Sequence, residues 1–289
     1  MIPTFVFVHG SGSSAHAWSA TQREMAARGH RTLALDLPGR GAGFTQAYYE
    51  QDLETFAAEP SAAIGSTADD FTGEVVDAVH RVRRHGPVVL VAHSFGGLPV
   101  TAAANAIPEL IDRVVYVAGQ CPVERAPWEY PSLPEWSSAD VFGAMAPLMV
   151  GDPARQGFIR TNWRGADRAR RIALRDAIAG ELTEEEFLAV VVTSQPDEVF
   201  WLGDTAWDIR ADKDSWGRIP HTFVKLTEDR SMPLAAQELY IAEGDALTPD
   251  NPFDVRELES SHAGFFRRKP AELAGILDDV SVGAGAGSR

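Results

Sequence analysis

Six short apolar runs recur along the chain, and most of them are separated by segments with helical patterns. The runs are residues 4–8, 31–36, 88–92, 113–118, 221–226 and 253–258. Continuous apolar, β-branched runs of this length are typical of strands that are buried on both faces of a parallel sheet. Their alternation with helices predicts an α/β fold, a mostly parallel six-stranded sheet with helices on both faces.

The helical segments carry their own start and stop signals. Thr67 and Asp70 have capping-box spacing at the start of the segment 66–86, and apolar residues recur on one face after them. The pattern over 17–30 ends at Gly29, a common helix terminator. Further helices are expected after Ser94, after Pro233 and over residues 270–280.

The alternation is interrupted between residues 122 and 220, where only the run FLAVVV at 187–192 resembles a strand. Because the strand pattern resumes afterwards, we expect an inserted, mainly helical cap. The expected parts are a first core part at 1–121, the cap at 122–220, a second core part at 221–280 and a disordered, Gly/Ser-rich tail at 281–289.

Composition and charge narrow the class of protein. With 289 residues, 45% of them apolar and 23% charged, the chain can bury a large core. A formal net charge of −15 argues against a general nucleic-acid partner or an anionic membrane surface. Cys121 is the single cysteine, which excludes an internal disulfide. No signal peptide is evident, and no apolar stretch approaches the roughly 20 residues that span a bilayer, so we expect a cytoplasmic protein.

The third apolar run ends in VVLVAHSFGG, where Ser94 stands between Ala92 and Gly96. A sharp strand-to-helix turn needs small residues two positions before and after the serine, and it lifts the hydroxyl clear of the sheet. Ser94 is therefore the candidate nucleophile, with an ordinary Gly-rich turn as the alternative. The backbone N–H of Phe95 would then point toward the oxygen of an attacked carbonyl group.

A second N–H donor is expected from the loop after the first strand. The sequence VFVHGSGSS supplies a Gly/Ser turn there, and we assign the donor to the backbone of Ser11. A plain connecting loop is the alternative. We expect the His9 imidazole to have a structural role.

The base that activates a serine should be a histidine beyond the last strand, and His262 occupies that place. Asp229 follows the fifth run and is the candidate acid that orients the imidazole. The order Ser94, Asp229, His262 matches this architecture. Glu124, after the fourth run, is the rival acid. The histidines at helix or strand boundaries lack the spacing of a metal site, namely His16, His30, His80, His85 and His221.

These motifs together resemble the α/β-hydrolase superfamily over nearly the whole chain. The sequence is most similar to the small esterases related to plant hydroxynitrile lyases and methylesterases. The matching stretches are FVHGSG, LALDLPGRG, VAHSFGG, VVYVAG, TEDRSMP and SSHAGFFRRKPAELA. The resemblance implies a capped, mostly parallel sheet and a cofactor-free triad at Ser94, Asp229 and His262, with no metal. Ala92 replaces the commoner glycine and Gly264 a frequent proline, and neither change removes a functional group.

The resemblance also separates hydrolysis from the lyase reaction. The lyases carry a threonine after the first-strand histidine and a lysine after the catalytic histidine, where this chain has Gly10 and Ala263. We therefore expect a carboxylesterase that works through an acyl-enzyme. A thioesterase or lactone-processing enzyme of a biosynthetic pathway is the main alternative, and a non-catalytic small-molecule receptor or a lyase-like enzyme are others.

Two features of the cap region concern the substrate. It holds six of the seven tryptophans: Trp128, Trp136, Trp163, Trp201, Trp207 and Trp216. They favour a bulky apolar or aromatic substrate or form the core of the cap itself. Arginines gather at Arg160, Arg164, Arg168, Arg170, Arg171 and Arg175. They could receive an anionic substrate or an acyl carrier protein, but a solvated helix face is the commoner reason for such a run.

Overall fold

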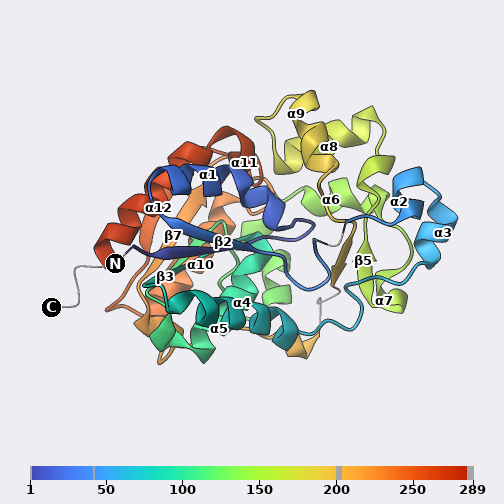
Figure 1. The fold of residues 1–289 in the computed structure, drawn as a ribbon. Coiled ribbons are helices and arrows are strands. Elements are labelled where there is room, and N and C mark those ends of the chain that lie inside the picture. The colour runs from blue at the N-terminus through green and yellow to red at the C-terminus, as the bar shows by residue number, and fades with distance from the viewer. Residues whose placement is uncertain (1, 42, 200–203, 285–289) are drawn as a thin grey trace.

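The sheet is parallel throughout and has the strand order β2-β1-β3-β4-β7-β8 (Figure 1). The computed structural model describes residues 2–41, 43–199 and 204–284. The strands are β1 Thr4–Val8, β2 Arg31–Leu35, β3 Val88–His93, β4 Arg113–Val117, β7 His221–Leu226 and β8 Asp254–Leu258. All six predicted strands are confirmed, with ends that differ by no more than one residue. The predicted α/β fold class is confirmed as well.

Helices cover both faces of this sheet, with α1 and α12 on one face and α4 and α5 on the other (Figure 1). They are α1 Ser19–Ala27, α4 Ala68–Arg83, α5 Gly97–Ala106, α10 Leu234–Leu247, α11 Phe265–Arg268 and α12 Pro270–Ala284. The predicted capping box begins α4. The Thr67 side chain accepts from the N–H of Asp70, and the Asp70 carboxylate accepts from the N–H of Thr67.

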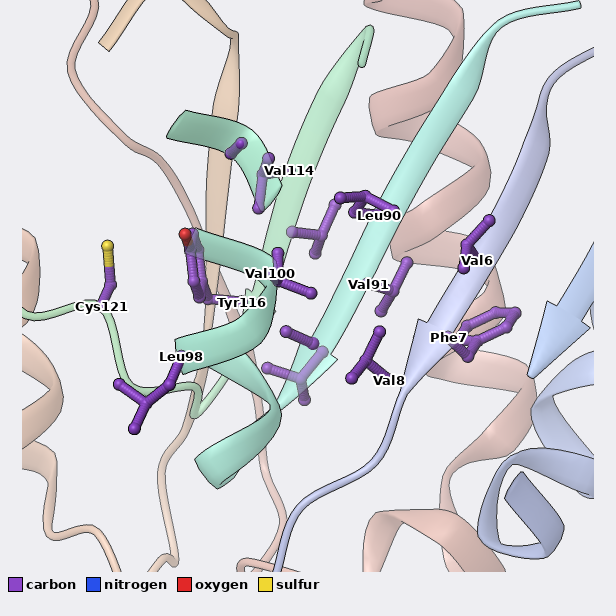
Figure 2. Packing of buried hydrophobic residues seen from close by; sticks show 14 of the residues in the cluster. Val6, Phe7, Val8, Leu90, Val91, Leu98, Val100, Val114, Tyr116 and Cys121 are labelled. Carbon is purple, nitrogen blue, oxygen red and sulfur yellow. The ribbon is translucent and has the colours of Figure 1, made fainter. Parts of the chain in front are cut away.

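The core lies between the central strands and these helices. Figure 2 shows the apolar side chains of β1, β3 and α5 packed together, with Val100 of α5 directed toward β3. Val8, Leu90 and Val91 are fully buried. Burial of one such side chain stabilises the fold by about 1.5–3 kcal/mol. The central strands therefore form a rigid base whose carboxyl ends can position a site.

The segment 122–220 contains, in its described parts 122–199 and 204–220, four α-helices and a small sheet. Its elements are α6 Val141–Met145, α7 Pro153–Gln156, β5 Phe158–Arg160, α8 Arg168–Ile178, α9 Glu184–Val191 and β6 Asp197–Val199. β5 and β6 pair antiparallel, and their three-residue length gave no periodic signal in the sequence. The ambiguous run 187–192 is helical through Val191, because a capping box at Thr183 and Glu186 starts α9.

The first part of the chain also contributes to the cap region. Helices α2 Gln46–Glu50 and α3 Leu53–Ala58 lie beside β5 (Figure 1). Arg160 of β5 donates to the carbonyl oxygens of Phe56 and Glu59. The boundary of the cap at residue 122 therefore stays a prediction from the sequence. In space, residues 46–59 of the first core part also pack against the predicted cap.

The predicted tail at 281–289 is only partly described. Residues 281–284 belong to α12, and residues 285–289 lie outside the described residues, as does Trp201. Short 3-10 helices connect the larger elements: η1 Ala15–Trp18, η2 Ser94–Gly96, η3 Pro108–Leu110, η4 Pro127–Ser132, η5 Pro134–Trp136, η6 Ala146–Leu148, η7 Trp163–Gly165, η8 Thr205–Trp207 and η9 Trp216–Arg218. Within the described ranges, none of the helices has the length and apolar character needed to cross a membrane.

Candidate active site

Ser94 lies at the turn between β3 and α5 with a left-handed backbone, φ 52°. A non-glycine residue in this region costs about 1–3 kcal/mol and needs support from its surroundings. That support comes from the end of β4. The N–H of Ser94 donates to the carbonyl oxygen of Ala118 at 3.2 Å, and the N–H of Gln120 donates to the carbonyl oxygen of Ser94 at 2.9 Å. The strained turn is therefore held by the neighbouring strand.

Small residues let the chain approach closely around Ser94, as the sequence predicts. A β-carbon at Gly96 would lie 2.5 Å from the carbonyl oxygen of His9. One at Gly10 would lie 2.8 Å from the Cβ of Ser94. Both distances are shorter than side-chain contacts allow, so the end of β1 and the serine turn can meet only through glycine.

The structure brings Ser94, His262 and Asp229 together although they come from three loops. His262 Nε2 lies 3.0 Å from the Oγ of Ser94, and His262 Nδ1 lies 2.6 Å from the Oδ2 of Asp229. The other oxygen of Asp229 accepts the N–H groups of Ser231 at 2.7 Å and Met232 at 2.8 Å. Because a carboxylate only accepts, Nδ1 of His262 carries a proton and Nε2 is free to take the serine proton.

The rival acid lies elsewhere. The Glu124 side chain is 58% exposed and pairs with Arg125 at 3.2 Å. Among the described residues, Asp229 is the carboxylate that contacts His262. Asp229 is 6% exposed, so its contact with the imidazole is shielded from water.

His93 contributes to the site although the sequence analysis did not single it out. Its Nε2 lies 2.9 Å from the carbonyl oxygen of His262, so this nitrogen carries the proton and donates. Burial holds the pKa of His93 well below its usual range, and the ring is neutral at physiological pH. His93 therefore fixes the backbone of the loop that carries His262. The sequence feature that could have identified His93 is its position directly before Ser94.

His9 organises the loop after β1. The N–H of Leu37 donates to His9 Nε2 at 3.2 Å, so the ring proton lies on Nδ1, which donates to the carbonyl oxygen of Gly10 at 2.8 Å. Burial lowers the pKa of His9 to about 3, which keeps this arrangement neutral. The carbonyl group of Gly10 shares its peptide plane with the N–H of Ser11. Fixing that carbonyl therefore fixes the direction of the Ser11 N–H.

The two predicted N–H donors, Ser11 and Phe95, both line the cavity beside Ser94. Within the described part of the chain, no group accepts a hydrogen bond from the Ser11 N–H. It is thus available to a ligand. Phe95 directly follows the nucleophile candidate at the start of η2.

The cavity has a volume of about 710 Å³ and is bounded by the sheet edge and the cap region. Ser94 and His262 lie on its wall, and most of the remaining wall is apolar. Of the cap tryptophans, Trp136 and Trp163 line it, whereas Trp207 and Trp216 are buried in the main core. Trp163 also belongs to the apolar cluster of the cap region, and a role of the tryptophans in substrate binding stays a prediction.

Other candidate groups are structural. Cys121 is buried and free, and burial raises its pKa to about 12, so it is a neutral thiol under ordinary conditions. His221 stacks on Trp216 and hydrogen-bonds the carbonyl oxygen of Ile219 at 2.8 Å. Over residues 2–41, 43–199 and 204–284, no group of three or more His, Cys, Asp or Glu side chains is arranged to hold a metal ion.

The fold and this site define a class of protein. The model of the alpha/beta hydrolase family matches residues 5–276, and the chain belongs to that family. It is an α/β hydrolase of the carboxylesterase type, and the resemblance to plant methylesterases is confirmed.

Among its relatives, methylesterase 7 of Arabidopsis thaliana is 25% identical over 289 residues, which is 96% of this chain and 95% of that protein. Polyneuridine aldehyde esterase of Rauvolfia serpentina is 22% identical over 279 residues, or 96% and 95% of the two chains. A crystal structure of polyneuridine aldehyde esterase has a TM-score of 0.70 and 20% identity over 97% of this chain and 100% of that one. A pyrethroid hydrolase from Sphingobium faniae JZ-2 has a TM-score of 0.72 and 18% identity over 99% of both chains.

Proposed function

We propose that the protein hydrolyses a carboxylic ester of a small, apolar or aromatic molecule through an acyl-enzyme in which Ser94 is the nucleophile. The observation that carries the proposal is the continuous contact from Ser94 through His262 to Asp229 on the wall of an apolar cavity. In this arrangement a serine, a base and a buried acid act as one unit.

The first half of the reaction forms the acyl-enzyme. His262 Nε2 takes the proton of Ser94 as its Oγ attacks the ester carbonyl carbon. The N–H groups of Ser11 and Phe95 donate to the oxyanion, and Asp229 stabilises the imidazolium ion. The imidazolium then gives its proton to the leaving alkoxide, and the alcohol departs.

The second half releases the acid. His262 takes a proton from a water molecule, and the hydroxide attacks the acyl carbon. The imidazolium then returns a proton to the Oγ of Ser94, and the carboxylic acid is released. Both halves use the same two N–H groups, so no further residue is needed for the chemistry.

The cavity favours a small-molecule ligand with a large apolar part. A volume of about 710 Å³ lies within the range of small-molecule sites. Apolar side chains on its wall, such as Phe142, Ile159 and Val190, favour an apolar acyl group or alcohol. The name methylesterase, which belongs to the Arabidopsis relative, makes a methyl ester of a bulky acid the first substrate to try.

The arginine run does not support a carrier protein as partner. Arg168 pairs with Glu184, Arg170 with Asp167 and Arg175 with Asp176. Arg160 is buried and paired with Asp197. A free small-molecule substrate is therefore our proposal, in a cytoplasmic protein as the sequence predicts.

A lyase reaction is less well supported than hydrolysis. A threonine in place of Gly10 would have its Cβ 2.8 Å from the Cβ of Ser94. Ala263 offers no ammonium group next to His262. The side chains that the resemblance assigns to cyanide chemistry are thus missing, and one of them has no room.

The test is the loss of activity in Ser94→Ala. We expect the wild-type protein to hydrolyse an activated aryl ester and to react covalently with a fluorophosphonate, and Ser94→Ala to do neither. Asp229→Asn should lower kcat by about 10⁴-fold. Ser194→Ala is the control, because this cavity serine bonds back to the carbonyl oxygen of Val190 and should still permit labelling.

Retention of hydrolysis and labelling in Ser94→Ala would refute the proposal. Methyl esters, thioesters and lactones of the same acyl group, compared by kcat/KM, identify the bond that the enzyme prefers. A ligand bound intact, without turnover by the wild-type protein, would instead identify a receptor.

A further inference from the structure

The loop that carries Ser11 is held from both sides at three consecutive peptide units. The first unit is fixed by His9, which donates to the carbonyl oxygen of Gly10. In the second, the N–H of Gly12 donates to the Oε2 of Glu198 at 3.2 Å. In the third, the carbonyl oxygen of Gly12 accepts the N–H of Gln195 at 2.9 Å. His9 belongs to the core, whereas Gln195 and Glu198 come from the cap region.

Glu198 is itself fixed by a buried ion pair. Its Oε1 contacts the guanidinium of Arg40 and accepts the N–H of Val199 at 2.9 Å. The Arg40 side chain is 1% exposed. A charge so deeply buried is stable only beside its counter-charge, so the Glu198 carboxylate has a defined place.

Gly12 has the backbone that this arrangement requires. Its φ is +64°, a conformation that residues with a side chain rarely adopt. A β-carbon there would lie 3.0 Å from the Cζ2 of Trp163, whose indole N–H donates to the carbonyl oxygen of Gln195 at 2.8 Å. Gly12 thus lies in a close-fitting pocket built by the cap region.

We infer that Glu198 is a positioning residue for the oxyanion site, which it fixes by accepting the Gly12 N–H directly after Ser11. This inference rests on the proposed function. Because Glu198 accepts the N–H of Gly12, the N–H of Ser11 is the donor in this loop that faces the reacting carbonyl group. A donor that shifts by about 1 Å loses much of its stabilisation of the transition state, whereas substrate binding in the apolar cavity changes little.

Two double variants isolate the contact from the buried charges. Arg40→Leu/Glu198→Gln removes both charges and keeps an oxygen that can accept the Gly12 N–H. Arg40→Leu/Glu198→Leu removes both charges and the acceptor. We expect the Leu/Gln variant to keep kcat within about 3-fold of wild type. The Leu/Leu variant should lose about 10- to 100-fold in kcat, with KM changed less than about 3-fold.

Three measurements separate positioning from a general loss of structure. Fluorophosphonate titration gives the fraction of active molecules, so that kcat refers to folded enzyme. Hydrogen–deuterium exchange of the peptide that contains Gly12 should be faster in the Leu/Leu variant than in the Leu/Gln variant. Arg160→Leu/Asp197→Leu removes a comparable buried pair from the other face of the same strand, and its kcat should stay within about 2-fold of wild type.

Equal kcat values in the Leu/Gln and Leu/Leu variants would overturn the role of Glu198. So would an equal loss of kcat in the Arg160/Asp197 control, which would indicate a general effect of cap stability. A wild-type protein with neither ester turnover nor phosphonate labelling would refute the proposed function first, and the positioning role with it.

Discussion

Asp197 and Glu198 are consecutive residues of β6, and each makes a buried ion pair with an arginine from elsewhere in the chain. Because side chains alternate along a strand, the two carboxylates point to opposite faces. Asp197 meets Arg160 with bonds of 2.7 and 2.6 Å, and Glu198 meets Arg40. The chemistry of the two pairs is the same, but they hold different parts of the molecule.

The ion pair between Asp197 and Arg160 holds the cap region against helices α2 and α3. Arg160 also donates to two carbonyl oxygens at the end of α3 and lies over the rings of Phe56 and Phe158. The Glu198 pair instead reaches the loop beside Ser94. We therefore expect the two buried ion pairs to have different consequences, one for stability alone and one for stability and catalysis. Their positions, and not their strength, decide this.

The largest expected effect is the loss of stability when either carboxylate is removed alone. Asp197→Leu and Glu198→Leu each leave a buried arginine without a counter-charge, which costs about 3–5 kcal/mol. Urea denaturation should show similar losses in the free energy of unfolding. Only Glu198→Leu should also lower kcat per titrated active site. Equal kcat losses in the two variants would break the comparison.

A second difference is the response to pH, because His9 lies on the Glu198 side. Burial, with a smaller contribution from the nearby charge of Arg40, lowers the pKa of His9 to about 3, whereas an unfolded chain has a value near 6.5. Below pH 6.5 the unfolded state binds a proton at His9 that the folded state does not. The free energy of unfolding therefore decreases as the pH is lowered. His9 alone should cost about 2 kcal/mol between pH 7 and pH 5.

The measurement is the slope of unfolding free energy against pH. The slope of His9→Gln should be smaller by up to one proton, or about 1.4 kcal/mol per pH unit. Asp197→Leu should leave the slope unchanged, since none of the described contacts of Arg160 involves a histidine. An unchanged slope in His9→Gln would contradict the buried neutral ring.

A smaller effect is expected from two glycines with left-handed backbones. Gly12 has φ +64° and its N–H donates to Glu198, whereas Gly157 has φ +79° and precedes β5. Either alanine substitution costs about 1–2 kcal/mol in strain. A β-carbon at Gly157 meets nothing within 4 Å, but one at Gly12 meets Trp163.

We therefore expect Gly12→Ala to lower kcat by about 10-fold and Gly157→Ala to leave it unchanged. Thermal melts should show a loss of stability for both variants, and a larger one for Gly12→Ala because its β-carbon also meets Trp163. If Gly12→Ala kept full kcat, the geometry of this loop would not limit the reaction.

The sheet, Ser94 and His262 could be predicted because their signals are local. A buried strand followed by a serine and glycines is visible within ten residues, and His262 follows the last strand directly. Glu198 could not be predicted in this way. Its importance depends on contact with Gly12, 186 positions away, and its strand has only three residues. The choice of Asp229 over Glu124 likewise depends on how two strand ends converge.

The smallest effect is expected from an ion pair that matches the Asp197 pair in geometry but not in burial. Arg168 of α8 binds Glu184 with two hydrogen bonds of 2.9 and 2.6 Å, yet its side chain is 71% exposed, against 1% for Arg160. Water already solvates an exposed guanidinium, so its removal leaves no buried charge behind. Arg168→Gln should therefore leave both the thermal midpoint and kcat unchanged.

Arg168→Gln also tests whether the arginine run attracts an anionic substrate. Neither Arg168 nor Glu184 lines the cavity within the described residues, so kcat/KM should be unchanged for an anionic ester and for its neutral counterpart. A selective loss for the anionic ester would mean that these charges attract substrate from a distance, an effect that would weaken with added salt. With no such loss, burial and position decide what an arginine–carboxylate pair contributes, and the two-bond geometry that the Arg160–Asp197 and Arg168–Glu184 pairs share does not.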